Sequence, residues 1–275
     1  MIVNADDLGL HPRIDEGILK AHREGIVTSA TVLVTGASAP EAVRRAKAQG
    51  LPLGVHLCLS TGLRSALPGS ELPSLAPAGA FPPSWLEVAK AWARRTLPLH
   101  EVRAELSAQL AKAQELGVTP DHLDAHQHLH LLPGVCAEVE ALARRERLPV
   151  RWPKERPRLG WLRRPGPAAK SALLGALGVW GGRSHGVRKV AAVGLFEAGA
   201  LTEAALLRLI ASLPAGEVEL GCHPGLDGPP IPEQPTWRYG WELELFALCS
   251  PAVREALRVG EIELISYADL SPLPR

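Results

Sequence analysis

The sequence has almost no surplus of charge of either sign. Its 30 lysines and arginines balance 29 aspartates and glutamates, so the formal net charge is +1. A surface without a strong field of one sign does not attract nucleic acid or an anionic membrane. Neither partner is therefore expected, whereas a small neutral carbohydrate is compatible with this composition.

Long apolar runs and closely paired cysteines are also missing. The most apolar window, Ala168–Trp180, contains Lys170 and Ser171 and is shorter than the roughly 20 apolar residues that cross a bilayer. The chain opens with two aspartates near its start, where a secretory leader would carry cationic and then apolar residues. The four cysteines form no Cys-x-x-Cys pair, which indicates reduced thiols: Cys58, Cys136, Cys222 and Cys249. We therefore expect a cytoplasmic protein that does not enter a membrane.

Short β-branched runs alternate with helical stretches along the chain. The helical stretches are marked by Pro40 and Gly50, by the 3.6-residue spacing within Glu101–Leu116, and by Ser250-Pro251. This alternation predicts a parallel α/β fold, either a (β/α) barrel or an open doubly wound sheet. The expected strands are Ile2–Asn4, Ser29–Val34, Leu53–Leu57, His122–Asp124, Val150–Arg151, Val190–Val193, Val218–Gly221 and Glu263–Ile265.

Three long segments rich in proline and glycine interrupt this alternation. They are Ala66–Ser84, Trp152–Ala168 and Pro224–Trp237, and each follows an expected strand. Such loops often form binding sites or lids in α/β proteins. Trp152 and Trp237 in two of them are candidate platforms for a sugar ring, or they pin the loops to the core. The Ala66–Ser84 loop is suited equally to substrate capture and to subunit contact in a homodimer.

Two adjacent carboxylates end the first expected strand, in Asn4-Ala5-Asp6-Asp7-Leu8-Gly9. Paired carboxylates repel each other unless a cation or a proton compensates. Neighbouring strand residues point in opposite directions, so one aspartate can bind a metal while the other accepts a proton. The alternative is that one aspartate caps the helix beginning near Pro12 and the other is solvated.

Four of the ten histidines lie within the segment 121–130. Together with an aspartate they alternate along it, and on an extended strand all five would share one face: His122, Asp124, His126, His128 and His130. Because neutral imidazole is a common metal ligand, this pattern favours a metal site. The spacing does not say which histidine binds the ion.

Two further histidines lie at the ends of expected strands. His56 shares a strand face with Cys58, which is either a soft ligand or a small buried residue. His223 follows Cys222 and precedes a Pro-Gly turn. Either histidine alone is weak evidence for a site.

Six short motifs stand in order along the chain. They are Asn-Ala-Asp-Asp-x-Gly at 4–9, Val-Thr-Ser-Ala-Thr at 27–31, Gly-Val-His-Leu at 54–57, His-Leu-Asp-x-His-x-His-x-His at 122–130, Cys-His-Pro-Gly at 222–225 and Leu-Ile-Ser-Tyr-Ala-Asp-Leu at 264–270. Together they resemble the YdjC-like carbohydrate deacetylases, which are similar in layout to NodB-type polysaccharide deacetylases. The resemblance implies one domain over residues 1–275, a distorted TIM-barrel-like (β/α) barrel with long loops at its C-terminal face.

The resemblance also implies a metal site. By position in the motifs, Asp7 is similar to the metal-binding carboxylate of the family, and His56 and His126 to its imidazole ligands. One divalent ion, Zn²⁺ or Mg²⁺, is expected there. Zinc suits two imidazoles and one carboxylate on softness, whereas magnesium prefers more oxygen ligands.

The remaining motif positions imply catalytic roles. Asp6 resembles the general base of the family, His223 the general acid, and Arg151 an arginine that braces the base. His128 is expected to contact the substrate. The implied activity is removal of the N-acetyl group from N-acetylated sugars such as chitobiose-like oligosaccharides, with release of acetate.

Two other readings of the same residues remain open. A metal-dependent phosphoesterase on a related barrel would need more metal ions and basic residues for phosphate. A sugar-binding protein on the same scaffold could dispense with the acid or the base, although both expected positions are filled here. Metal stoichiometry and acetate release distinguish the three possibilities.

Overall fold

The computed structural model describes residues 1–154, 172–178, 186–229, 231 and 239–270. Within these ranges, seven parallel strands pair in chain order and close into a barrel, because β1 also pairs with β7. Of the two expected architectures, the (β/α) barrel is therefore confirmed and the open sheet is not. The strands are β1 (Ile2–Leu8), β2 (Ser29–Val32), β3 (Leu53–Leu57), β4 (Leu123–Ala125), β5 (Val150–Pro153), β6 (Lys189–Val193) and β7 (Val218–Cys222).

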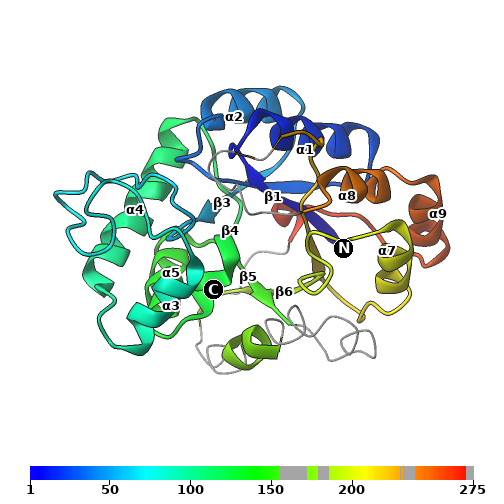
Figure 1. The fold of residues 1–275 in the computed structure, drawn as a ribbon. Helices are drawn as coiled ribbons and strands as arrows, with labels where there is room; N and C mark the ends of the chain where they lie inside the picture. The colour runs from blue at the N-terminus through cyan, green and yellow to red at the C-terminus, as the bar shows by residue number, and fades with distance from the viewer. Residues whose placement is uncertain (155–171, 179–185, 230, 232–238, 271–275) are drawn as a thin grey trace.

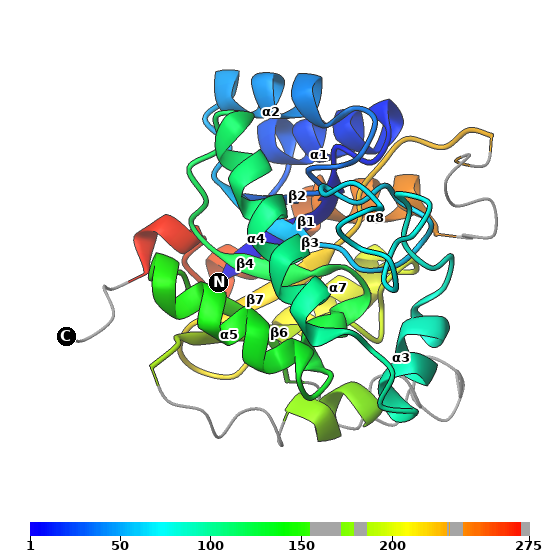
Figure 2. The ribbon, with the colours of Figure 1, turned by 90° about the vertical axis from the view of Figure 1, so that its left-hand side faces the viewer.

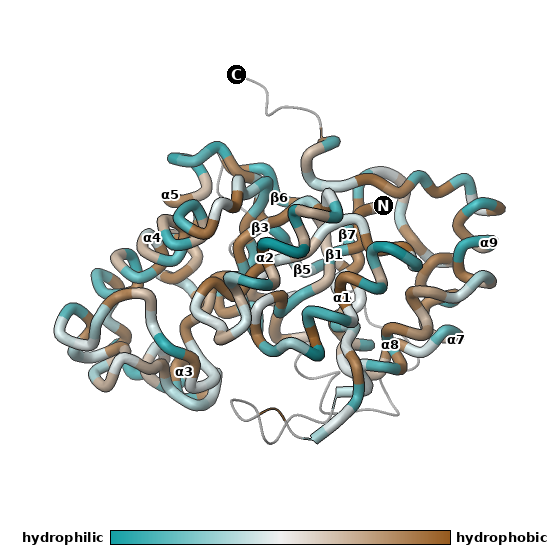
Figure 3. The backbone as a smooth tube through the Cα atoms, turned by 90° about the horizontal axis from the view of Figure 1, so that it is seen from above, coloured by the Kyte–Doolittle hydropathy of each residue, from teal (hydrophilic) through white to brown (hydrophobic). Residues whose placement is uncertain are grey.

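Helices surround the strands, as Figure 1 shows. None of the helices in the described ranges is long and apolar enough to cross a membrane. In Figure 3, hydrophilic and hydrophobic stretches alternate along the outer helices, as expected for helices with one buried face. They are α1 (Pro12–Glu24), α2 (Ala39–Ala48), α3 (Trp85–Ala93), α4 (Leu99–Glu115), α5 (Val135–Glu146), α7 (Glu203–Ile210), α8 (Trp241–Leu248) and α9 (Pro251–Val259), with short 3-10 helices η1 (His126–Leu131) and η3 (Tyr267–Asp269).

Local chemistry sets the helix ends that the sequence marked. In α9, Ser250 is the N-cap and its Oγ accepts hydrogen bonds from the N–H groups of Ala252 and Val253. In α1, His11 caps the helix and Pro12 occupies the first turn. The predicted core face of α4 is confirmed, since its members are almost fully buried: Val102, Leu106, Leu110 and Ala113.

The prediction of an eighth strand at Glu263–Ile265 is wrong. This segment runs beside the start of the barrel, where the Met1 amino group donates to the Glu263 carbonyl and Ile265 N–H donates to the Met1 carbonyl. It adds no strand, because β1 already pairs with β2 on one side and β7 on the other. The segment leads instead to Tyr267, which packs with Ile2 and Val190 at the N-terminal end of the barrel.

The long loop Ala66–Ser84 is folded against α4, as Figure 2 shows in cyan. Glu105 accepts hydrogen bonds from the backbone N–H groups of Ala66 and Leu67. Glu101, one helical turn earlier, accepts bonds from Ser74 and Leu75. Buried carboxylates that accept several backbone N–H bonds fix a loop firmly, so this segment is part of the scaffold around the site.

The barrel interior is polar, which is unusual for a packed barrel. Most apolar strand residues face the helices, while polar side chains with at most 3% exposure point inward from six of the strands and from the residue before β4: Asn4, Asp6, Ser29, Thr31, His56, His122, Asp124, Arg151 and Glu219. Burying so many polar groups is costly unless they pair with one another or with a ligand. The interior is therefore the place to look for chemistry.

Candidate metal centre and active site

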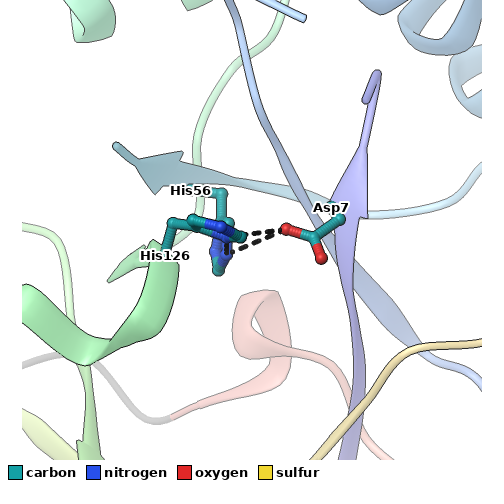
Figure 4. A group of neighbouring side chains, drawn as sticks. All are labelled: Asp7, His56 and His126. Carbon is teal, nitrogen blue, oxygen red and sulfur yellow. Dashed lines mark hydrogen bonds and ion pairs between the residues drawn. The ribbon is translucent and has the colours of Figure 1, made fainter. Parts of the chain in front are cut away.

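Three side chains from distant parts of the chain meet at the carboxyl ends of the strands. Asp7 comes from β1, His56 from β3 and His126 from the start of η1, and Figure 4 shows them pointing at one another. Asp7 Oδ1 lies 2.9 Å from His126 Nδ1 and 3.4 Å from His56 Nε2, and the two imidazole nitrogens are 3.3 Å apart. The structure thus brings together the three residues that the sequence indicated as metal ligands.

A bulge in β1 directs both aspartates into this site. Ala5 pairs with Ala30 and Leu8 with Val32, so three steps on β1 match two on β2. Asp7 lies at the extra position with φ 70°, in the left-handed region that aspartate tolerates better than most residues. The expected opposite orientation of neighbouring side chains is therefore wrong here, and Asp6 and Asp7 line the same pocket.

The alternation of histidines beyond β4 is broken in a similar way. The strand ends at Ala125, and Gln127 and His128 adopt φ values of 55° and 58° within η1. The expectation of one extended face for all five residues is therefore wrong. His126 and His128 reach the pocket, whereas His122 stacks on Tyr267 at 3.7 Å between ring centroids and His130 bonds to the Arg151 carbonyl.

Asp124 sets the tautomer of His56. Its Oδ1 accepts a hydrogen bond from His56 Nδ1 at 2.6 Å, which leaves the lone pair of a neutral ring on Nε2, facing Asp7 and His126. Metal-ligating histidines commonly carry such a carboxylate partner. Burial disfavours protonation of His56, but Asp124 and the other carboxylates outweigh burial and raise its pKa to about 9. The site therefore attracts positive charge.

The donor set fits a divalent cation. Ligand atoms about 2.0–2.1 Å from a tetrahedral ion are roughly 3.3 Å apart, close to the three separations found here. A second group, Asp6, His56 and Asp124, also has its donor atoms within 4.8 Å of one another. Its two carboxylates are bound to Arg151, so this group is an ion-pair network and Asp7, His56 and His126 are the better candidate ligands.

Arg151 holds Asp6 with two hydrogen bonds. Its two terminal nitrogens donate to Asp6 Oδ2 and Oδ1, each at 2.6 Å, and Asn4 donates a further bond to Oδ1 at 3.0 Å. Burial opposes the charge of Asp6, but Arg151 outweighs burial and holds the pKa of Asp6 well below its usual range. Asp6 therefore stays ionised and fixed, with a lone pair of Oδ2 left for another partner.

His223 faces Asp6 across the pocket. It follows β7, and its Nε2 lies 3.7 Å from Asp6 Oδ2. Glu244 on α8 accepts a hydrogen bond from the His223 backbone N–H at 2.7 Å and another from Gly199 N–H at 2.6 Å. The His223 ring makes an edge contact with Tyr239 at 5.1 Å between centroids. The loops after β6 and β7 are thus joined around His223.

The pocket itself has a cavity volume of about 30 Å³. His128 lines it, while Trp152 does not. The Trp152 side chain is 8% exposed and packs in the core, where its Nε1 donates to the Gly178 carbonyl. Trp237 lies outside the described residues. Cys58 is not a ligand in this arrangement, since it is buried beside Ser60 and burial raises the pKa of its thiol to about 12.

Three site residues were missed as functional candidates in the sequence. The sequence pattern groups Asp124 with the histidines and does not mark it as a partner of a ligand, although its place two residues before His126 in a buried strand is a signal. Glu219 is a charged residue inside an apolar strand, and it bonds to Arg151 Nε at 2.6 Å. Glu244 lies on a helix remote in sequence, and nothing near it indicated its contact with His223.

Fold and site together define a parallel (β/α)-barrel protein with a candidate mononuclear metal centre at the carboxyl end of the barrel. The chain belongs to the YdjC-like protein family, whose family model matches residues 1–259. It is 36% identical over 298 residues to a mouse protein named carbohydrate deacetylase, covering 98% of this chain and 94% of that one. It is 30% identical to the chitooligosaccharide deacetylase of Serratia marcescens, with 98% of each chain covered.

A solved structure from Enterococcus faecalis V583 has the same fold. That protein was assigned provisionally to cellobiose-phosphate cleavage. The two structures superpose with a TM-score of 0.78 at 29% identity and cover 98% of each chain. The shared fold therefore extends over nearly the whole length of both chains.

Proposed function

We propose that this protein is a metal-dependent carbohydrate deacetylase that hydrolyses the N-acetyl group of small N-acetylated sugars and releases acetate. One observation carries the proposal: an ionised Asp6 and His223 flank the Asp7, His56 and His126 cluster within one pocket. The names of the mouse and Serratia relatives support the same chemistry. Chitobiose-like oligosaccharides are the proposed substrates.

Asp7, His56 and His126 would hold one divalent ion, Zn²⁺ or Mg²⁺. When bound, such an ion lowers the pKa of a water molecule and polarises an acetamide carbonyl. Two imidazole nitrogens and one carboxylate favour zinc. Asp124 keeps His56 in the ligating tautomer through its 2.6 Å hydrogen bond.

Asp6 accepts the proton of the attacking water. Arg151 and Asn4 occupy three of its acceptor sites, so Oδ2 presents its remaining lone pair toward His223. Because Arg151 keeps Asp6 ionised, the base is ready at neutral pH. Its low basicity is offset by fixed orientation, which is itself a large part of catalysis.

His223 supplies a proton to the departing nitrogen. An amide anion is too poor a leaving group, so the C–N bond breaks only as nitrogen becomes protonated. The side chain of His223 is 16% exposed at the pocket wall, and its backbone is held by Glu244. The products are acetate and the free amino sugar.

The rival phosphoesterase has less support from the site. A phosphate substrate needs cationic side chains with donors to spare. None of the described residues that line the pocket is a lysine or an arginine. Arg151, which binds Asp6, is itself surrounded by the carboxylates of Asp6, Asp124 and Glu219. A non-catalytic sugar-binding protein would not require the opposed Asp6 and His223.

The test is acetate release from mono-, di- and trimers of N-acetylglucosamine, with metal analysis of the same sample. We expect about one ion per chain and turnover of at least one oligomer. Asp6→Asn should lose turnover and keep the metal, whereas His126→Ala should lose the metal. Asp227→Asn and His100→Ala, at exposed positions outside the pocket, are the matched controls. Normal turnover in Asp6→Asn would remove Asp6 from the role of base.

A further inference from the structure

A second, smaller cavity adjoins the candidate active site. Its volume is about 20 Å³, and Asp6, His128 and His223 line both cavities. The rest of its wall is formed mainly by small or apolar residues that follow β6 or end β6 and β7: Ala192, Gly194, Leu195, Ala198 and Gly221. The cavity thus extends from the acid and base toward the carboxyl ends of these two strands.

The second cavity exists because two inward-facing positions of its wall are occupied by residues with a small side chain or none. Ala192 and Gly221 follow inward-facing Val190 and Glu219 by two residues, so they point into the barrel. A Cβ built on Gly221 would lie 3.9 Å from the Arg151 guanidinium carbon, which is an ordinary contact. One carbon atom therefore fits here without disturbing the fold.

The wall suits a carbon atom better than a water molecule. A cavity of this size holds about one water-sized group, but a buried water needs two to four polar partners. The five N–H groups of Arg151 already face carboxylates, on Asp6, Asp124 and Glu219. Asp6, His128 and His223 lie at the boundary shared with the first cavity, and the other wall residues carry no polar side chain, so a methyl group is the better match for the far end of the cavity.

We propose that this cavity binds the acyl chain of the substrate and limits it to the acetyl methyl group. The proposal rests on the proposed deacetylase function and adds its acyl specificity. The acyl carbon would lie in the first cavity beside Asp6, with its methyl group in the second. Water adds to the acyl carbon, the C–N bond breaks, nitrogen gains the proton from His223, and the carboxylic acid leaves with all acyl carbons.

The experiment compares one chitobiose skeleton bearing N-formyl, N-acetyl, N-propionyl or N-butyryl groups, using metal-loaded protein. One methylene too many in a tight pocket costs roughly 10–200-fold in kcat/KM. We expect propionyl to fall below acetyl by that factor and butyryl to fall further. Calorimetric binding of formate, acetate, propionate and butyrate gives an independent readout, in which affinity should drop beyond acetate.

Two variants test the residues assigned to the wall. Gly221→Ala places a methyl group in the cavity, so the acetyl-to-formyl ratio of kcat/KM should fall roughly tenfold or more. Leu195→Ala enlarges the cavity and should raise the propionyl-to-acetyl ratio by a similar factor. Leu86→Ala on α3, where the side chain is 45% exposed, is the matched control and should leave both ratios unchanged.

Each possible result separates this proposal from the function on which it rests. Equal rates for acetyl and butyryl substrates, or equal losses on formyl and acetyl in Gly221→Ala, would overturn the acyl cavity alone. Release of no acid from any of the four substrates would overturn the deacetylase function and the cavity together.

Discussion

Replacing Arg151 with methionine would keep much of the side-chain volume and remove the guanidinium. The residue is 1% exposed and contacts the carboxylates of Asp6, Asp124 and Glu219. Without it, three buried carboxylates would share the barrel interior. Removing one partner of a buried ion pair costs about 3–5 kcal/mol, and we expect the upper part of that range because three contacts are lost.

The effect is measured by thermal unfolding in the presence of a chelator, so that metal binding does not add to stability. For a chain of this size, each kcal/mol shifts Tm by about 2–4 °C, so Arg151→Met should lower Tm by about 10 °C or more. The control is Arg103→Met. Arg103 also makes two hydrogen bonds to one carboxylate, that of Glu138, but its side chain is 71% exposed.

Exposed ion pairs contribute little to stability, so the control should scarcely move Tm. Equal shifts in the two variants would refute the reasoning, because they would mean that burial of the Arg151 network carries no special weight. A loss of secondary structure in Arg151→Met at low temperature would agree with a large penalty, and the midpoint in urea then replaces Tm as the measure.

Three further predictions concern single carboxylates. Asp124→Asn should weaken zinc binding about 10–100-fold, because a neutral amide replaces the carboxylate that accepts the His56 Nδ1 hydrogen bond; unchanged affinity by zinc titration would contradict this. Glu244→Gln should lower kcat roughly tenfold or more at unchanged metal content, because it disturbs the backbone contact that positions His223; a change in KM alone would count against it. Burial raises the pKa of Asp15 to about 6 in the folded protein, above its value in the unfolded chain. Protonation of Asp15 therefore stabilises the fold at low pH, and this stabilisation is lost as pH rises through 6. The free energy of unfolding of Asp15→Asn, measured in urea, should therefore rise by about 2–3 kcal/mol relative to that of the wild type between pH 4 and pH 7. Parallel curves of unfolding free energy against pH for the two proteins would refute this.

The strands could be predicted because their signal is local. Seven of the eight expected segments are strands of the described barrel, and only Glu263–Ile265 is not. That segment has a strand composition, but β1 already pairs with β2 on one side and, across more than 200 residues of sequence, with β7 on the other. Such long-range competition for an edge leaves no trace in a short window of sequence.

Side-chain directions within the site were harder to predict. A period of two residues assumes regular strand geometry, and the site breaks that geometry at Asp7, Gln127 and His128, all with positive φ. The residue types themselves gave no warning, since none of the three is glycine. The motif resemblance selected Asp7, His56 and His126, whereas alternation alone would have grouped His122 and His130 with them.

The buried charges lead us to propose that this barrel binds one divalent ion and not two. Asp6, Asp7 and Asp124 are buried carboxylates, and Arg151 supplies a single positive charge among them. Histidines that ligate a metal are neutral, so the side chains of a metal-loaded interior carry two net negative charges, or three when Glu219 is also ionised. Burial raises the pKa of Glu219, which favours the smaller number.

One divalent ion brings this interior to neutrality or to a single negative charge, whereas a second would leave it positive in a region of low dielectric. We therefore expect metal analysis to level off at one zinc per chain as zinc is added. Asp7→Asn removes both a ligand and a charge, so it should lose that ion. A second ion bound with comparable affinity would contradict this charge balance and would favour the multi-metal phosphoesterase instead.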